Sequence, residues 1–318
     1  RSKYLLLIMK SFSRFAIFTT LLTYILIFVG GLVRVSGAGM GCPDWPKCFG
    51  RWIPPTRLDQ LPADIDPAQF NIVLAWIEYS NRLVGVVIGL MITITLILAY
   101  RYFKNEKQIF RPILFAFLMV GLVGWQGSQV VASVLNPLTV SLHMVLALLA
   151  VSSLIMGTQN AYYFVNPQVE KETYYPCKMK MAFWAMALVL FIEIILGTEL
   201  RAGLEMVRKD NPLVESILLL KMIGPFKYIH TILGVALAGL SGWIWYFFAN
   251  KSDNPSLLVK RTSLGILVLV MIQILVGELM VFSSVSPIYQ LFHMWSATWV
   301  LGLLIVTYGA WKRSKDLK

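Results

Sequence analysis

The chain consists of long, continuously apolar runs separated by shorter polar segments. Each run is close to the roughly 20 residues that an α-helix needs to cross the hydrocarbon layer of a bilayer. The eight runs lie at residues 15–33, 82–100, 113–135, 140–164, 181–200, 229–249, 264–284 and 289–311. Strands of a membrane barrel would alternate apolar and polar residues, and these runs do not alternate. The pattern therefore predicts an all-α integral membrane protein with eight transmembrane helices.

The composition agrees with a membrane-embedded chain. Of the 318 residues, 58% are hydrophobic and only 14% are charged, whereas a soluble domain carries about a quarter charged residues. The net charge is +12, but no stretch matches a nucleic-acid-binding motif, so nucleic acid is not an expected partner. The first apolar run exceeds the roughly 7–15 residues of a signal-peptide core and lacks a small-residue cleavage site, so we expect a retained span.

The positive charges indicate the orientation of the chain in the bilayer. Five segments on one side of the predicted spans hold 18 of the 28 lysines and arginines, namely 1–14, 101–111, 165–180, 250–262 and the C-terminal tail. Lysine and arginine collect in cytoplasmic loops. We therefore expect a multi-pass protein of the cytoplasmic membrane with both termini in the cytoplasm.

The sequence repeats itself once along its length. The positions Gly127, Ser133, Pro137 and His143-Met144 match Gly277, Ser283, Pro287 and His293-Met294 at a constant offset of 150 residues. Weaker matches relate Asn81 to His230, at an offset of 149, and Gly30 and Arg34 to Gly197 and Arg201. The repeat predicts two pseudo-symmetric four-helix bundles, formed by residues 1–165 and 166–318.

The chain has three histidines, and all three fall at matched positions of this repeat. His143, His230 and His293, with Asn81 at the fourth position, each lie near the outer start of an even-numbered span. An imidazole in an apolar helix is unfavourable unless it is paired or binds a metal. A hydrogen bond to a neighbouring helix would explain one such histidine. Because all three histidines of the chain lie at repeat-related positions, a ligand site is favoured over such a hydrogen bond.

Two histidines on facing helices are a common way for a helical bundle to hold haem iron. We therefore interpret His230 and His293 as a bis-imidazole haem site, and His143 with Asn81 as its counterpart in the first half. Asparagine is a poor iron ligand, so the first site would keep a weak or open axial position. A closed six-coordinate haem suits electron transfer, whereas an open position suits chemistry on the iron or nearby.

Charged side chains accompany these positions. Arg34, Arg82 and Arg201 lie at outer span ends, where they are candidate contacts for haem propionates or ordinary interfacial anchors. Glu78 precedes Asn81 by one helical turn on the same face. It is a candidate base or a stabiliser of positive charge, and a salt bridge to Arg82 is the equally weighted alternative. Glu193 lies within the fifth span, where a carboxylate is a functional candidate or a partner for Arg201.

Cys42 and Cys48 lie in the long outer loop with five residues between them. Because that side is oxidising we expect a disulfide, with two free thiols or a metal pair as alternatives.

These features together resemble the haem A synthase family along essentially all eight spans. The similarity is carried by Gly30-Gly-Leu-Val-Arg34, by the outer loop from Cys42 to Pro55 with its two cysteines, by Glu78-Tyr-Ser-Asn-Arg82 and by the three histidines. The family oxidises the C8 methyl group of haem O to a formyl group, which gives haem A for terminal oxidases. Where the family has histidine in its Glu-x-x-His pattern, this chain has Asn81.

The resemblance implies a role for each candidate residue. His230 and His293 would ligate a haem b cofactor, and His143, with Asn81 opposite, would form the iron site for the substrate haem. Glu78 would be the catalytic carboxylate, and Cys42 and Cys48 would be the paired outer-loop cysteines. Haem O and haem A would be substrate and product, and haem O synthase and a terminal oxidase are candidate protein partners.

Two other functions are compatible with parts of this pattern. A b-type cytochrome that only transfers electrons would need one haem site and could carry a degenerate first half. A membrane carrier would also show two repeats, but the spans lack the polar cluster and the paired helix breaks near the bilayer centre that carriers typically have. The sequence leaves the electron acceptor and the oligomeric state open.

Overall fold

The computed structural model describes residues 2–63, 65–167, 177–211, 214, 216–252, 256–283 and 285–313. In this part of the chain, eight helices are long and apolar enough to cross a membrane, and none of the described residues forms a strand longer than the single bridge between Cys48 and Arg51. The predicted fold class, all-α with eight membrane spans, is confirmed.

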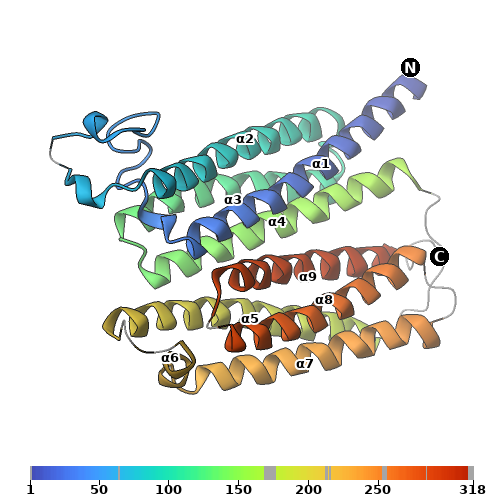
Figure 1. Cartoon of the computed structure of the whole chain (residues 1–318). Coiled ribbons are helices and arrows are strands. Elements are labelled where there is room, and N and C mark those ends of the chain that lie inside the picture. The colour runs from blue at the N-terminus through green and yellow to red at the C-terminus, as the bar shows by residue number, and fades with distance from the viewer. Residues whose placement is uncertain are drawn as a thin grey trace. The chain divides into compact units, whose positions relative to one another are not determined.

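Short connections join α2 to α3 and α3 to α4, whereas a long outer segment joins α1 to α2 (Figure 1). Their bounds are α1 Ser2–Val35, α2 Ile72–Phe103, α3 Lys107–Ala132, α4 Pro137–Val165, α5 Cys177–Asp210, α6 Ser216–Met222, α7 Phe226–Tyr246, α8 Leu257–Phe282 and α9 Pro287–Arg313. A π-helical turn, Phe247–Lys251, continues α7, and three short 3-10 turns lie between α1 and α2.

The chain forms two compact units, Arg1–Thr158 and Gln159–Lys318. In the first unit α1 packs on α2 and α2 packs on α3. The α4 helix closes the bundle: the hydroxyls of Thr20 and Thr158 share a hydrogen bond of 3.1 Å, and the missing side chain at Gly157 admits Ile113 of α3. Small and hydroxyl-bearing residues at such contacts let helix backbones approach each other closely.

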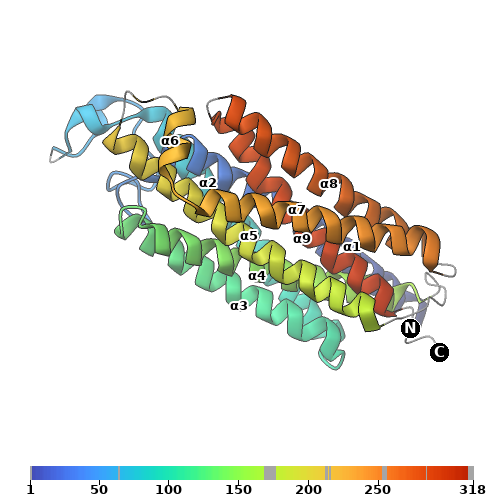
Figure 2. The same cartoon turned by 90° about the horizontal axis from the view of Figure 1, so that it is seen from below.

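The second unit is also a closed ring of four long helices. The α5 helix packs on α7, α7 on α8, α8 on α9 and α9 on α5 (Figure 2). A fully buried Trp311 anchors its core, with Phe183 stacked on it at 5.4 Å between ring centres and Phe248 at 6.1 Å. The short α6 packs beside α5.

The hairpin turns α3–α4 and α8–α9 have the same local structure. The amide of Leu135 donates to the carbonyl of Val130, and the amide of Val285 donates to that of Met280. Leu135 and Val285 both adopt positive φ, 60° and 59°. The repeated sequence thus produces the same tight turn twice, and each turn sets the position of the histidine helix that follows it.

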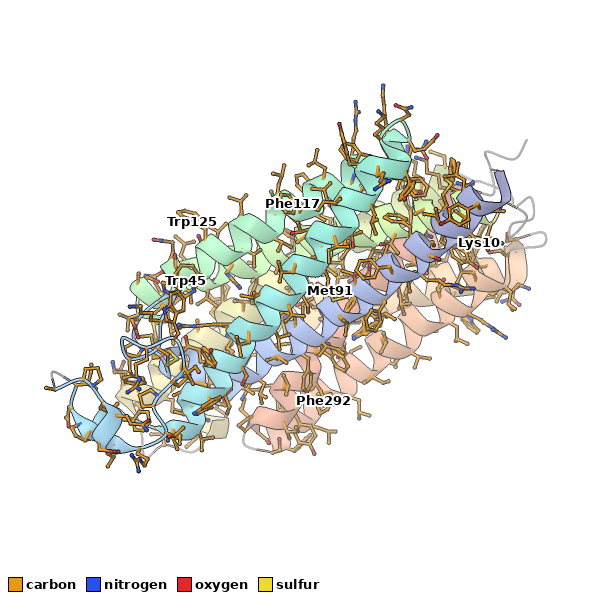
Figure 3. All side chains as sticks on the ribbon, turned by 90° about the horizontal axis from the view of Figure 1, so that it is seen from above. Lys10, Trp45, Met91, Phe117, Trp125 and Phe292 are labelled. Atoms are coloured by element: carbon orange, nitrogen blue, oxygen red, sulfur yellow. A yellow bond between two sulfur atoms is a disulfide. The ribbon has the colours of Figure 1, made fainter. Side chains whose placement is uncertain are left out.

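Large apolar side chains cover much of the outward surface of both units. Trp125 of α3 and Phe292 of α9 are 59% and 44% exposed, and Trp45 of the outer segment is 48% exposed (Figure 3). Apolar exposure on this scale is unfavourable in water and expected where a helix faces lipid.

Candidate functional site

Each of the four repeat-related polar side chains lies against a glycine of the neighbouring helix. A methyl group placed on Gly127, Gly197 or Gly277 would lie 3.7, 3.4 or 3.6 Å from Cε1 of the histidine facing it. Those histidines are His143, His230 and His293, in the same order. Asn81 makes the fourth such pair, with its Oδ1 3.8 Å from a methyl group on Gly30. The glycines therefore give each ligand candidate a small cradle that a larger side chain would fill.

Three of the four glycines lie near the end of their helix, and Gly197 lies within α5. Gly30, Gly127 and Gly277 each stand five residues before the last residue of α1, α3 and α8. His143 and His293 each lie six residues after the start of their helix, about 9 Å along the axis. Asn81 lies nine residues into α2, about 14 Å, because α2 begins earlier than its apolar run.

The structure brings His230 and His293 together. Their ring centres are 6.2 Å apart and their planes are inclined by 60°. With metal–imidazole bonds of about 2.0–2.1 Å, two rings on opposite sides of one ion have centres roughly 6 Å apart. The spacing therefore fits a metal held between α7 and α9.

The ring nitrogens also fit a ligand site. Nδ1 of His143 and Nδ1 of His293 are buried without a hydrogen-bond partner among the described residues. A buried polar atom left unsatisfied costs about 1–3 kcal/mol, so such atoms need an explanation. A haem iron or a group that accompanies it would provide one, and the residues of the second unit fit that group.

The two histidines make different contacts, one through the backbone and one through the ring. Gln273 of α8 donates from Nε2 to the backbone carbonyl of His293 at 2.8 Å. The Glu193 carboxylate of α5 is in ion-pair contact with Nδ1 of His230. The sequence interpretation that pairs Glu193 with Arg201 is wrong, because eight residues separate them by about 12 Å along the helix. Arg201 instead pairs with Glu205, one turn away, at 2.5 Å.

In the first unit, Glu78 and Arg82 clamp the outer segment onto α2. Glu78 is 4% exposed. It accepts a hydrogen bond from the Cys42 amide at 2.7 Å and pairs with Arg82 at 2.5 Å. Arg82 also donates to the carbonyls of Asp44 and Lys47, at 2.8 and 2.7 Å. The salt bridge weighed against a catalytic role is therefore present, and a propionate would have to share Arg82 with the loop.

Cys42 and Cys48 form the expected disulfide, with a Cα–Cα distance of 4.7 Å. Both cysteines are fully buried, and Asp44 inside the ring accepts hydrogen bonds from the amides of Phe49 and Gly50. Gly41 lies so close to the Leu74 carbonyl that a methyl group there would overlap it. The disulfide, the clamp and this close contact together fix the loop on the N-terminal part of α2.

This clamp leads to a test of loop placement. Replacing Arg82 by leucine is expected to leave the charge of the buried Glu78 carboxylate uncompensated. The attachment of the loop to α2 should then be destabilised by about 3 kcal/mol. The double variant Arg82→Leu/Glu78→Leu should recover part of that loss, because no buried charge then remains. Protease cleavage between residues 43 and 63 of the purified protein measures it. Equal cleavage in the wild type and in Arg82→Leu would contradict the clamp.

The remaining arginine candidates have polar contacts of their own. Arg34 of α1 donates to the sulfur of Met144, the residue after His143, at 3.2 Å. It therefore lies beside the first-unit histidine helix. Arg201 lies one turn beyond Gly197, which cradles His230. Both positions remain compatible with propionate contacts, one in each unit.

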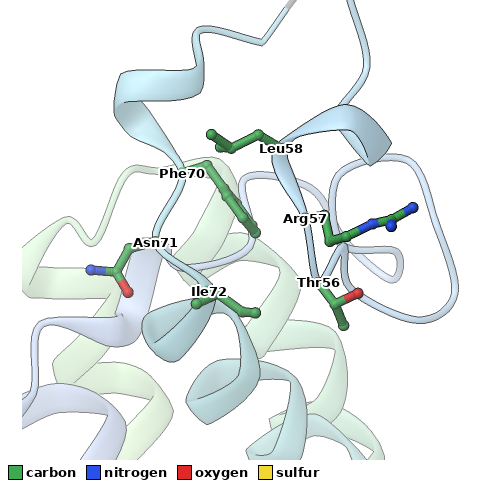
Figure 4. Close-up of a pocket in the computed structure, with 6 residues that line it drawn as sticks. All are labelled: Thr56, Arg57, Leu58, Phe70, Asn71 and Ile72. Atoms are coloured by element: carbon green, nitrogen blue, oxygen red, sulfur yellow. The ribbon is translucent and has the colours of Figure 1, made fainter.

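The outer segment carries a separate, open surface pocket of about 400 Å³. Figure 4 shows its lining, which comprises Thr56, Arg57, Leu58, Phe70, Asn71 and Ile72. None of the histidines or Asn81 lines it. Within the described residues, no cluster of three or more His, Cys, Asp or Glu side chains is arranged to hold a bare metal ion. The one histidine pair of the described residues, His230 with His293, would fit an iron whose other ligands come from a prosthetic group.

Sequence comparisons agree with this arrangement. A family described as cytochrome oxidase assembly protein, COX15-CtaA, matches residues 13–305. A protein named Heme A synthase from Symbiobacterium thermophilum is 25% identical over 93% of this chain and 94% of its own length. One from Geobacillus kaustophilus is 24% identical, over 93% and 90%. Another, from Shouchella clausii, is 28% identical over 50% of this chain and 48% of its own length.

Fold and site together define a polytopic membrane protein of two helical bundles with histidines paired across helices. The match over almost the whole length is specific, and the chain belongs to the COX15-CtaA family of cytochrome oxidase assembly proteins.

Proposed function

We propose that this protein is a haem A synthase, a membrane enzyme that oxidises the C8 methyl group of haem O to the formyl group of haem A. Two relatives that carry the name Heme A synthase align with more than nine tenths of the chain. The juxtaposition of His230 and His293, with ring centres 6.2 Å apart, is the observation that carries the proposal. It provides a site for the haem b that such an enzyme would use.

In this proposal the second unit binds the haem b cofactor and the first unit binds the substrate haem. His230 and His293 hold haem b in the second unit, and the bound haem supplies electron transfer there. His143 and Asn81 face the substrate haem in the first unit. Asn81 Oδ1 is buried without a hydrogen-bond partner among the described residues, so it is available to a ligand of that site.

Glu78 and the disulfide loop complete the first unit. Glu78 lies one turn from Asn81 on α2, and Arg82 and the Cys42 amide hold its carboxylate in a fixed orientation. We keep Glu78 as the candidate catalytic carboxylate and assign the loop the role of covering the substrate site. Arg34 and Arg201 are the proposed propionate contacts.

The cellular setting follows from the charges and the substrate. We place the protein in the cytoplasmic membrane with both termini in the cytoplasm, because lysine and arginine favour that side. An enzyme that makes haem O must supply the substrate, and a terminal oxidase that contains haem A must consume the product.

A b-type cytochrome is the second candidate, and Asn81 favours it, because this residue removes one expected iron ligand from the first unit. Expression of the full chain in cells that make haem O but no haem A separates the two functions. We expect extracted pigment to contain haem A. Pigment that contains haem B but no haem A, from a well-expressed protein, would refute the synthase proposal and support the cytochrome.

A further inference from the structure

We propose that Glu193 is a positioning residue for His230: its carboxylate fixes the imidazole through Nδ1 and places a negative charge beside the iron. The inference rests on the proposed haem b site and goes beyond it by assigning a residue that sets the properties of that haem. Glu193 belongs to α5, which contributes no iron ligand of its own.

The geometry shows two helices that interlock through four residues. On α5, Glu193 and Gly197 lie one turn apart, and on α7, His230 and Gly234 lie one turn apart. The His230 ring lies over Gly197, and Oε1 of Glu193 lies 3.6 Å from the place of a methyl group on Gly234. The other oxygen, Oε2, contacts Nδ1 of His230. Each polar side chain thus occupies the space left by the glycine of the opposite helix.

This contact determines which nitrogen of His230 is available. A histidine that ligates a metal usually donates its other ring N–H to a carboxylate or a carbonyl, which fixes the tautomer and the ring orientation. With Nδ1 occupied by Glu193, Nε2 is the nitrogen left for iron. The ion pairs of the described residues include no such carboxylate contact for His293.

The first unit provides an internal comparison. The repeat aligns Glu193 with Leu26, His230 with Asn81 and Gly234 with Gly85. Leu26 is partly buried in an apolar cluster of that unit, and the space beside Gly85 is open. In this one pair of equivalent positions, the carboxylate accompanies the imidazole of His230 and is absent where Asn81 replaces it. That correlation favours a shared function over general packing.

The burial of Glu193 supports the same conclusion. Its side chain is only 7% exposed, against 55% for Glu205 on the same helix. A buried carboxylate inside a membrane span is unfavourable without a partner. His230 is the ionisable group in contact with it, so the placement of Glu193 depends on His230.

The test compares Glu193→Gln and Glu193→Leu with Glu106→Gln, which changes an exposed carboxylate of the first unit, in the purified full-length protein. A carboxylate near the iron favours the ferric state, so removing its charge should raise the midpoint potential of haem b. We expect Glu193→Gln to raise this potential with the low-spin spectrum retained. Glu193→Leu should also lose haem to apomyoglobin about 10–100-fold faster. Glu106→Gln should match the wild type.

The outcomes distinguish a positioning role of Glu193 from a packing role. A potential and a haem-loss rate in Glu193→Gln equal to those of the wild type would overturn the inference. A Glu193 variant that binds no haem but keeps the wild-type helix content and elution volume would support the positioning role. A variant that loses haem together with the wild-type helix content and elution volume would make Glu193 a packing residue only. Failure of the haem b site itself is distinct, because haem binding would then survive His230→Ala.

Discussion

Replacing His293 by alanine is expected to abolish the low-spin haem b spectrum of the protein. The imidazole is one of two rings that meet 6.2 Å apart between α7 and α9, and the missing side chain of Gly277 leaves room for this ring. Alanine offers no nitrogen, so a bound iron would retain His230 alone. A five-coordinate haem is expected to become high-spin or to dissociate, and the same result is expected for His230→Ala.

Electron paramagnetic resonance of the oxidised protein and the absorption of the reduced haem measure this change. His143→Ala is the matched control, because it removes a histidine at the equivalent repeat position of the other unit and should leave the haem b signal intact. An unchanged bis-imidazole signal in His293→Ala or His230→Ala would show that these histidines are not the ligands.

The membrane spans were predictable because apolar runs of about 20 residues have few other structural solutions. The ends of these helices were less predictable. The α2 helix begins at Ile72, ten residues before its predicted start at residue 82, because Asn71 caps it. The charged residues of its second and third turns, Glu78 and Arg82, also bond to the backbone of the cysteine loop. A hydropathy pattern does not contain that loop contact.

The candidate site was predictable to the level of residues but not of contacts. The repeat singled out the histidines and their glycines, yet it could not show that each glycine contacts a histidine across a helix interface. These contacts depend on how each helix is rotated about its own axis, which the sequence repeat does not specify. Glu193 illustrates the same limit. Its neighbours along α5 suggested an arginine partner, whereas its contact is His230 on α7.

The first unit is where this chain departs most from a symmetric pair of haem sites. The repeat places Asn81 where the second unit has His230, and both side chains lie against a glycine of the preceding long helix. Asparagine is shorter than histidine and binds iron weakly. We therefore expect the first-unit iron to be held chiefly by His143, in a high-spin or water-ligated state, with faster haem exchange than in the second unit.

Asn81→His is expected to convert this site to low spin. Gly30 leaves room for a ring at position 81, as Gly197 does for His230, and the space beside Gly85 is open. A second strong ligand should slow the release of haem from the first unit. Turnover that depends on product leaving should therefore fall, even though substrate occupancy rises.

Electron paramagnetic resonance of the protein with haem in both units tests the prediction. The wild type should show one low-spin bis-imidazole signal and one high-spin component, and Asn81→His should show two low-spin signals. Asn81→Ala is the control for side-chain loss, and it should keep the high-spin component. Two low-spin signals in the wild type would mean that another residue supplies the second ligand. The loose ligation that we assign to Asn81 would then be wrong, and the haem A synthase proposal would rest on the second unit and the family relationship alone.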